Sequence, residues 1–531
     1  MNTASRTTSF GASLPAPVGG WNARDPIAQM APTDAIFLDN FFPRTGDVLL
    51  RKGSGLWATL PTDTPGGTLN NVRSLLAYNL PTGLGKLFAA TETGLYDITS
   101  GGTVTTVASA ATYNVWESVN ISTAGGNFLW CCNGVDKARY FNGTTWTVLD
   151  GTSTPALTGI TSTSITHVNL FKSRLYLCAK SSLSFYYLPV NSVAGAAAEF
   201  PLGAIFRRGG YLVATGTWTL DGGNGPEDYF VAVSSEGEVA VYSGIDPSNA
   251  ATWALQGVYF IGKPLGTRCL VKFGGDLLLL TVRGLFPLSK ALQSATVDTR
   301  SAVSDKISNA WIEYAQAYGT LFGWQLELYP DATMLVVNAP IAFDAATNLI
   351  NSHQFVMNTQ TGAWARFTEM GAEVIAYYGK RLFFAANNKV FLAWEGGFDA
   401  GDKPIPGGVK SAFVYPAGKG SIAQVKMLRP IFSSNGNQLN IQLGVDQDYT
   451  TRELSGNQIT YLQSGAFWDQ SKWDEAYWQD NDLTLVTLIS KWRSVSHYPG
   501  RALALRLRIL SKGVSMAWTA TDFILQKGGM R

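Results

Sequence analysis

The chain has 531 residues, of which 46% are hydrophobic, 12% aromatic and only 15% charged. This length leaves room for two to four domains, and the apolar content excludes a chain that is disordered throughout. The 40 basic residues exceed the 38 acidic residues by two, so the overall charge does not indicate general nucleic-acid binding, and such a role would depend on where charges lie.

The first sixty residues precede any regular pattern. Residues 1–13 lack the apolar stretch of a signal peptide and are expected to form a flexible tail. Residues 14–60 mix apolar groups with Pro and Gly, and we expect this N-terminal segment to close onto the domain that follows. No apolar run in the chain approaches ~18 residues, so the sequence predicts no membrane-spanning helix.

A hydrophobic and aromatic cassette then recurs about every fifty residues, a period typical of stacked or radial repeats. Each copy has a run of about five apolar residues, a short polar turn and a second apolar run, which together indicate a β-hairpin. The copies begin at Leu87, Phe128, Leu175, Phe230, Leu277, Met334 and Leu382. Polar turns that end on Trp146, Trp253 and Trp364 recur between them, and we expect these rings to pack against an adjacent repeat.

This pattern predicts that residues 61–400 form a β-propeller of six or seven blades, uninterrupted by a helix of normal length. A tandem of β-sandwiches is the alternative fold. The Gly- and Pro-rich residues 401–408 are expected to form a linker.

Residues 409–531 show longer alternating strands and are expected to form an additional C-terminal β-sandwich domain, so the fold class is all-β. Residues 501–509 alternate, with leucines on one face and Arg506 and Arg508 on a half-exposed face. A loop at 467–478 carries Trp468, Trp473 and Trp478, which are candidates for a protein interface. Alternatively, these rings cover their own sandwich.

The sequence predicts no catalytic, cofactor-binding or metal-binding residues. His167, His353 and His497 are far apart without metal-ligand spacing, and no HExxH, GxSxG or Walker A motif occurs. The four cysteines, at 131, 132, 178 and 269, are expected to be buried thiols in a reducing compartment. Residues 358–364 weakly echo the Asp-box turn of glycan-cleaving propellers, and carboxylate pairs in space are not visible in a sequence.

Basic residues give a further hypothesis. Arg207 and Arg208 lie in a loop beside two glycines, and Arg506 and Arg508 share a strand face. These four are candidates for lining a DNA channel, because one Arg in a ring of identical subunits becomes a circle of charges. The alternative is a solvated or salt-bridged surface.

Four short stretches of the N-terminal segment resemble the start of a known family. They are GGWNARDP at 19–26, MAPTDA at 30–35 and LDNFFP at 38–43, followed by LRKG at 50–53. In these stretches the chain is similar to the tail nozzle proteins of short-tailed bacteriophages, also called tail tubular or packaged-DNA stabilisation proteins.

The resemblance implies a β-propeller with added β-domains that assembles as a ring, with six copies, below the portal and adaptor. Such a virion structural protein, made in the host cytoplasm, would extend the DNA channel of the tail, retain packaged double-stranded DNA and conduct it during ejection. Partners implied are the adaptor or connector proteins and tail fibres or a tail needle. The low charge content fits a surface covered by other subunits, although an all-β, Thr- and Gly-rich composition accounts for it equally. A phage-borne glycan-binding or glycan-cleaving propeller is the alternative function. A WD-type scaffold would need Gly-His and Trp-Asp dipeptides, which the cassettes lack.

Overall fold

The structure is a computed structural model, and it divides into two compact units that are described separately. Unit 1 comprises residues 1–55, 355–368 and 393–531, and unit 2 comprises residues 56–354 and 369–392. The residues that the structure describes are 9–61, 70–81, 83, 85–109, 111–221, 226–291, 299–344, 349–434, 438–451, 454, 459–462, 487–494, 499–511 and 513–528.

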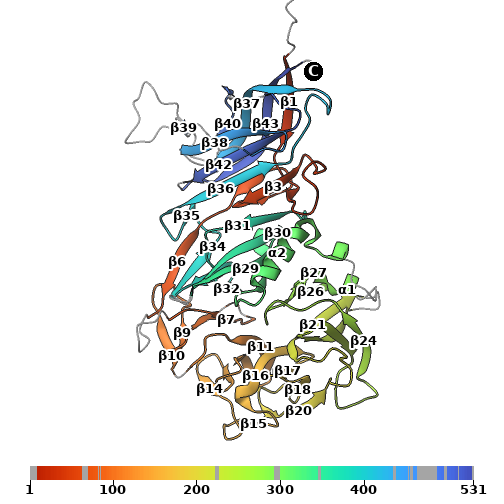
Figure 1. Ribbon diagram of the computed structural model, residues 1–531. Helices are drawn as coiled ribbons and strands as arrows, with labels where there is room; N and C mark the ends of the chain where they lie inside the picture. Colours follow the sequence, from red (N-terminus) through yellow and green to blue (C-terminus); the bar gives the residue numbers. More distant parts are fainter. Residues whose placement is uncertain are drawn as a thin grey trace, which may run out of the picture. The chain divides into compact units, whose positions relative to one another are not determined.

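Within the described residues of the repeat region, seven successive groups of strands form the blades of a propeller (Figure 1). Six of these groups are separate antiparallel sheets, and the remaining one, blade 6, is part of a larger sheet. Blade 1 contains β7 (Ser74–Tyr78), β8 (Lys86–Ala90), β9 (Gly94–Asp97) and β10 (Thr105–Ser109). Blade 2 contains β11 (Glu117–Thr123), β12 (Gly126–Cys132), β13 (Arg139–Phe141) and β14 (Trp146–Val148). Blade 3 contains β16 (Ile165–Phe171), β17 (Arg174–Ala179), β18 (Ser184–Tyr187) and β20 (Ala198–Pro201), and β15 (Leu157–Thr158) pairs with β19 (Gly195–Ala196) beside it.

The remaining blades follow in chain order. Blade 4 contains β21 (Leu212–Asp221), β22 (Pro226–Ser234), β23 (Glu238–Ser243) and β24 (Ala254–Phe260), and blade 5 contains β25 (Leu270–Phe273), β26 (Asp276–Thr281) and β27 (Gly284–Pro287). Blade 6 begins with β28 (Gln325–Tyr329), β29 (Met334–Asp344) and β30 (Leu349–Asn358), whose last residues enter unit 1. Blade 7 contains β32 (Val374–Tyr378), β33 (Arg381–Ala386) and β34 (Lys389–Ala393), and it is completed by β6 (Ser54–Thr59) from the N-terminal segment.

The first strands of the blades close into a ring. Each one contacts the next in the order β7, β11, β16, β21, β25, β28, β32, and β32 contacts β7 again. Six of the seven cassettes are the second and third strands of their blades, whereas the cassette at Met334 covers only part of the second strand, β29, of blade 6. The predicted propeller is therefore confirmed, and the blade count among the described residues is seven.

Apolar side chains hold neighbouring blades together. Blades 1 and 2 share a core that includes Phe88 and Phe141, and Trp146 lies 5.1 Å from Phe88, measured between ring centroids. Blades 3 and 4 share a second core, in which Trp253 of blade 4 packs against Tyr176 of blade 3. These two tryptophans thus contact an adjacent blade, as the recurring polar turns predict.

The expectation of a propeller without a helix is wrong at one place. After β27 the chain forms α1 (Leu288–Ala291), the 3-10 turns η2 (Thr299–Ser301) and η3 (Asp305–Ile307), and α2 (Ser308–Tyr318). The helix α2 packs against β29, and its buried Trp311 donates its indole N–H to the Thr281 carbonyl of β26 at 2.9 Å. Further 3-10 turns are η1 (Ser162–Ser164) and η4 (Pro330–Ala332). Among the described residues, no helix is long and apolar enough to cross a membrane.

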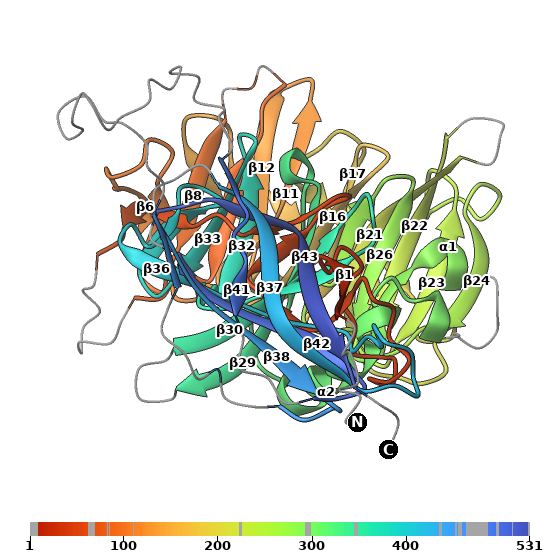
Figure 2. The same ribbon diagram turned by 90° about the horizontal axis from the view of Figure 1, so that it is seen from above.

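Unit 1 is built from both ends of the chain. One sheet joins β4 (Phe41–Pro43), β5 (Val48–Leu50), β43 (Met516–Lys527), β37 (Ala423–Ser434) and β40 (Thr487–Ile489), with β1 (Ser9–Pro15) on β43 and β41 (Arg493–Ser494) on β37. The other has the order β31 (Trp364–Phe367), β3 (Asp34–Asp39), β36 (Lys403–Ser411), β42 (Leu503–Ser511), β38 (Gln438–Gln447) and β39 (Ile459–Leu462), with β2 (Gly20–Trp21) on β3 and β35 (Phe398–Asp399) on β36. Figures 1 and 2 both show the red strand β1 beside the blue strand β43.

This arrangement corrects three expected boundaries. Residues 403–408 are not a linker, because they form most of β36, which pairs with β3 on one side and β42 on the other. The N-terminal segment joins the propeller through β6, whereas β1 to β5 belong to the C-terminal sandwich of unit 1. Residues 9–13, expected within a flexible tail, form most of β1 and pair with β43.

Candidate functional site: the central channel of the propeller

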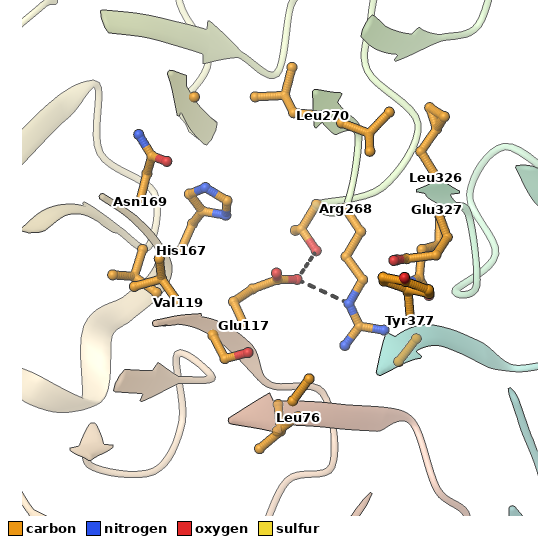
Figure 3. A pocket seen from close by; sticks show the side chains of 18 of the residues that line it. Leu76, Glu117, Val119, His167, Asn169, Arg268, Leu270, Leu326, Glu327 and Tyr377 are labelled. Atoms are coloured by element: carbon orange, nitrogen blue, oxygen red, sulfur yellow. Dashed lines mark hydrogen bonds and ion pairs between the residues drawn. The ribbon is translucent and has the colours of Figure 1, made fainter. Parts of the chain in front are cut away.

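A cavity of about 390 Å³ lies inside the ring of first strands in unit 2 (Figure 3). Its lining comes from β7, β11, β16, β21, β25, β28 and β32, so all seven blades contribute. Leu76, Val119, Leu270 and Leu326 supply apolar surface, and charged and amide side chains lie between them.

Polar side chains of the channel link adjacent blades, because first strands of different blades do not form a shared backbone ladder. The Asn120 side-chain amide donates to the Ala77 carbonyl at 2.9 Å, which joins blade 2 to blade 1. The Gln325 amide donates to the Ile375 carbonyl at 2.6 Å and accepts from the Ile375 N–H at 3.1 Å, which joins blade 6 to blade 7.

Arg268 crosses the channel. It lies just before β25 of blade 5, yet its guanidinium group donates to the Arg73 carbonyl at 3.1 Å and to Ser74 Oγ at 2.8 Å on the opposite side of the ring. It also donates to the Trp116 carbonyl at 2.9 Å and forms an ion pair with Glu117 at 3.3 Å. Figure 3 shows Glu117 and Arg268 facing each other. Both side chains are about 15% exposed, which limits the screening of their attraction by water.

Glu327 is the second carboxylate of the channel. Desolvation inside the ring raises the pKa of its carboxyl group to about 7. A hydrogen bond from the Tyr377 backbone, the nearby charge of Arg268 and a hydrogen bond from Gln325 all oppose this rise without cancelling it. The channel therefore holds one glutamate paired with an arginine, Glu117, and one glutamate whose pKa is raised to about 7, Glu327.

His167 also lies in the channel. Its Nε2 is 3.0 Å from the Thr215 carbonyl, so Nε2 carries the proton and donates. Among the described residues, its Nδ1 is buried without a hydrogen-bond partner. In the described part of the chain, no group of three or more His, Cys, Asp or Glu side chains is arranged to hold a metal ion.

The residues singled out by the sequence do not meet in this channel, apart from His167. Arg207 and Arg208 are exposed in the loop between blades 3 and 4. Arg508 is exposed on β42, but Arg506 is only 6% exposed, which corrects the expectation of a half-exposed face. The reason is that residues on both faces of this part of β42, from Leu503 to Leu507, are buried.

Other predicted residues have simpler outcomes. His353 lies beside Tyr314, whose hydroxyl is 2.9 Å from its Nδ1. His497, Trp468, Trp473 and Trp478 lie outside the described residues. All four cysteines are buried free thiols, as expected, and burial raises the pKa of Cys178 and Cys269 to about 12.

Sequence reasoning missed Glu117, Arg268 and Glu327. Each is a charged residue within or next to the short first strand of a blade, and that placement was the available signal. It does not reveal the partners, because Glu117 and Arg268 are separated by 151 positions in the chain.

The residues of the N-terminal motif form the framework of unit 1. The Asn22 amide donates to Asp34 at 2.8 Å, and the Arg51 guanidinium donates to Asn40 at 2.7 Å and to Asp399 at 2.7 Å. Gly20 has a φ of +80°, and a Cβ there would lie 2.6 Å from the Trp364 carbonyl oxygen. Only glycine suits this position, because both the backbone conformation and the close approach of the chain exclude a side chain.

No protein-family model matches the chain, and no curated protein matches its sequence. Solved structures with a similar fold include YCF48 from Cyanidioschyzon merolae, at 12% identity and a TM-score of 0.36 over 64% of this chain and 99% of that chain. The β-propeller domain of Myceliophteria thermophila Cps50 (Swd1) is 11% identical, with a TM-score of 0.38 over 61% and 97%. The Neurospora crassa Pan2 WD40 domain is 10% identical, with a TM-score of 0.35 over 61% and 90%. Because these TM-scores are low, the assignment of a propeller fold rests on the closed ring that the first strands of the blades form.

Proposed function

We propose that this chain is a structural subunit of the tail of a short-tailed phage, a nozzle protein that forms a ring around the path of the DNA. The observation that carries the proposal is the role of the N-terminal motif. The residues that carry the resemblance, among them Asn22, Asp34, Asn40 and Arg51, are the residues that bond to one another and to Asp399 in the interior of unit 1. Because the residues that this chain has in common with the nozzle family bond to one another inside unit 1, they support the proposal that the chain and the family share the architecture of that unit.

The size of the propeller channel determines where DNA could pass. A cavity of about 390 Å³ is in the range of sites for small molecules, and Arg268 bridges it. Duplex DNA has a major groove that alone is about 12 Å wide. The proposed conduit is therefore the axis of a ring of several copies, in which each propeller is a rigid wall unit, and we propose six copies in the virion tail.

The decisive test is assembly. We expect the purified full-length chain, mixed with the adaptor ring of the same phage, to form a six-fold ring that cryo-microscopy resolves with an open axis. A chain that stays monomeric with the adaptor and is absent from purified virions would contradict the proposal. Mass spectrometry of purified tails measures that presence independently of assembly in vitro.

One observation favours a second candidate, a glycan-cleaving propeller. Glycoside hydrolysis uses one protonated and one ionised carboxyl group, and the channel holds Glu327 with a pKa of about 7 together with the arginine-paired Glu117. This candidate predicts release of reducing sugar from host polysaccharide, and loss of that release in Glu327→Gln but not in Glu313→Gln, an exposed control. If the wild-type chain releases no sugar from any host polysaccharide tested, this candidate is excluded.

A further inference from the structure

Two arginines of unit 2 converge on one aromatic ring outside the channel. The Arg208 guanidinium carbon lies 3.8 Å from the ring centroid of Phe260, and that of Arg283 lies 5.6 Å from the same centroid. Phe260 ends β24 of blade 4, whereas Arg283 lies in the turn between β26 and β27 of blade 5. We call Arg208, Phe260 and Arg283 the arginine clamp.

The loop that carries Arg208 is held in place by several contacts. Glu238, only 6% exposed, accepts hydrogen bonds from the backbone N–H groups of Arg207 at 3.1 Å and Arg208 at 2.8 Å. Glu238 also pairs with Phe260 across β23 and β24, so it fixes the loop directly beside the ring. Gly210 has a φ of +90°, and a Cβ there would lie 2.3 Å from Ser235 Oγ. The tight loop therefore presents the Arg208 side chain in a defined position.

The charges around the clamp are unbalanced. Arg207, Arg208 and Arg283 are exposed, and within the described part of the chain none of the three forms an ion pair with a carboxylate. Lys263 adds a positive charge, but it is paired with Glu236 at 2.8 Å. Two guanidinium groups that share one ring repel each other, and an anion bound between them would remove that repulsion.

We propose that the arginine clamp binds a phosphate group of a nucleic-acid backbone. A guanidinium group donates in a planar fork, and one fork occupies both oxygens of a carboxylate. A phosphate has more acceptor oxygens around one central atom than a carboxylate has. It can therefore accept hydrogen bonds from the paired N–H groups of two guanidinium groups at once, which favours phosphate over an acidic side chain. Both guanidinium carbons lie within 5.6 Å of one ring centroid, and the proposal places a single phosphate between the two groups.

The site belongs to the single subunit, so its test does not depend on ring assembly or on the proposed tail role. The measurement is fluorescence anisotropy of a labelled duplex DNA titrated with the full-length chain at several salt concentrations. The reversal variant is Arg208→Glu with Arg283→Glu. The matched control is Lys389→Glu with Lys403→Glu, which changes the net charge equally at exposed positions elsewhere.

We expect the reversal variant to bind the duplex at least about tenfold more weakly than the control variant. We also expect the slope of the logarithm of its association constant against the logarithm of the salt concentration to be smaller in magnitude by about 2. Equal binding by the two variants, or no binding by the wild-type chain, would overturn the proposal. Melting temperatures establish that each variant is folded. If the reversal variant does not fold, Arg208→Lys with Arg283→Lys keeps the charge but loses the forks, and it should still weaken binding.

Two further probes separate the sources of the anion. Polyglutamate should bind no more weakly to the reversal variant than to the control; an equal loss of polyglutamate and duplex binding would assign the clamp to acidic proteins and overturn the proposal. Calorimetry with inorganic phosphate provides the last comparison. Binding of inorganic phosphate without binding of the duplex would assign the clamp to a small phosphate compound and equally overturn it.

Discussion

Arg51 carries its charge into the interior of unit 1, where its side chain is only 1% exposed. It pairs with Asp399 and donates to Asn40 and to the Thr368 carbonyl, so its hydrogen-bonding groups are used inside the fold. Removing one member of a buried ion pair leaves the other charge without compensation.

We therefore expect Arg51→Ala to lower the free energy of unfolding by about 3–5 kcal/mol. The matched control is Arg44→Ala, since Arg44 pairs with Asp47 but is 44% exposed, and it should cost less than about 1 kcal/mol. Urea denaturation measures both. Similar losses in the two variants would mean that burial does not determine the strength of these pairs.

Glu327 makes the stability of the propeller depend on pH. Its pKa of about 7 in the fold lies above that of an unfolded chain, at about 4.5. The folded state therefore binds more protons between these values, and its stability falls as the pH rises through this window. Glu327→Gln stays uncharged, so its stability relative to the wild type should increase from about pH 5 to about pH 7.5 and then remain constant. Urea denaturation across this range measures the difference, and Glu313→Gln, at an exposed position, should show no such trend.

At the scale of elements, tryptophans hold neighbouring blades together. Trp57 of β6 packs on Phe383 of blade 7 at 5.2 Å between ring centroids, and its indole N–H donates to the Ile98 carbonyl of blade 1 at 2.7 Å. It thus lies where the ring is closed by the N-terminal strand. Trp253 lies between blades 3 and 4 instead.

Replacing each tryptophan by alanine should loosen the blades that it joins, because the cavity removes packing on both sides. We expect Trp57→Ala to raise amide hydrogen exchange in β6, β34 and β9, and Trp253→Ala to raise it in blades 3 and 4 without affecting β6. Mass spectrometry of peptides from both variants measures this. A uniform increase over all blades would show that the propeller opens as a single unit.

The elements also show where sequence patterns succeed. Cassettes predict β8–β9 to β33–β34 because two buried strands joined by a tight turn need apolar runs and a Gly- or Asn-containing turn, whatever the rest of the chain does. Residues 403–408 of β36 were missed because Gly and Pro indicate a loop locally. They are accommodated in a strand because Gly407 faces Ile509, Leu50 and Phe41 so closely that a Cβ would lie within 3 Å of all three.

At the scale of the whole molecule, we expect Arg506 to matter for folding and Arg508 to matter for the proposed function. Arg506 is buried on β42, whereas Arg508, two positions later, is exposed. We expect Arg506→Glu to lower the free energy of unfolding by at least about 2 kcal/mol, because it replaces a buried cation by an acid, and Arg508→Glu to change it by no more than about 0.5 kcal/mol. Denaturation of both variants measures this, and comparable losses would contradict the assigned burial.

This difference decides which variant informs the proposed tail role. Under that role, Arg508 is the member of the pair that remains a candidate for lining the DNA path. Virions that carry Arg508→Glu should assemble and differ from the wild type in DNA retention or ejection. Normal retention and ejection by such virions would remove Arg508 from the candidates.

The sequence by itself determined the propeller, the second and third strands of six blades, the additional sandwich and the burial of the four cysteines, because these follow from local apolar patterns and turn residues. Only the tertiary structure decided that β6 closes blade 7, that β1 to β5 belong with the C-terminal strands, and that Arg268 crosses the channel to Glu117. It also decided that Arg506 is buried and that Arg208 and Arg283 share the ring of Phe260. These features join residues far apart in the chain, and a local pattern carries no information about which distant charge or strand edge will be adjacent after folding.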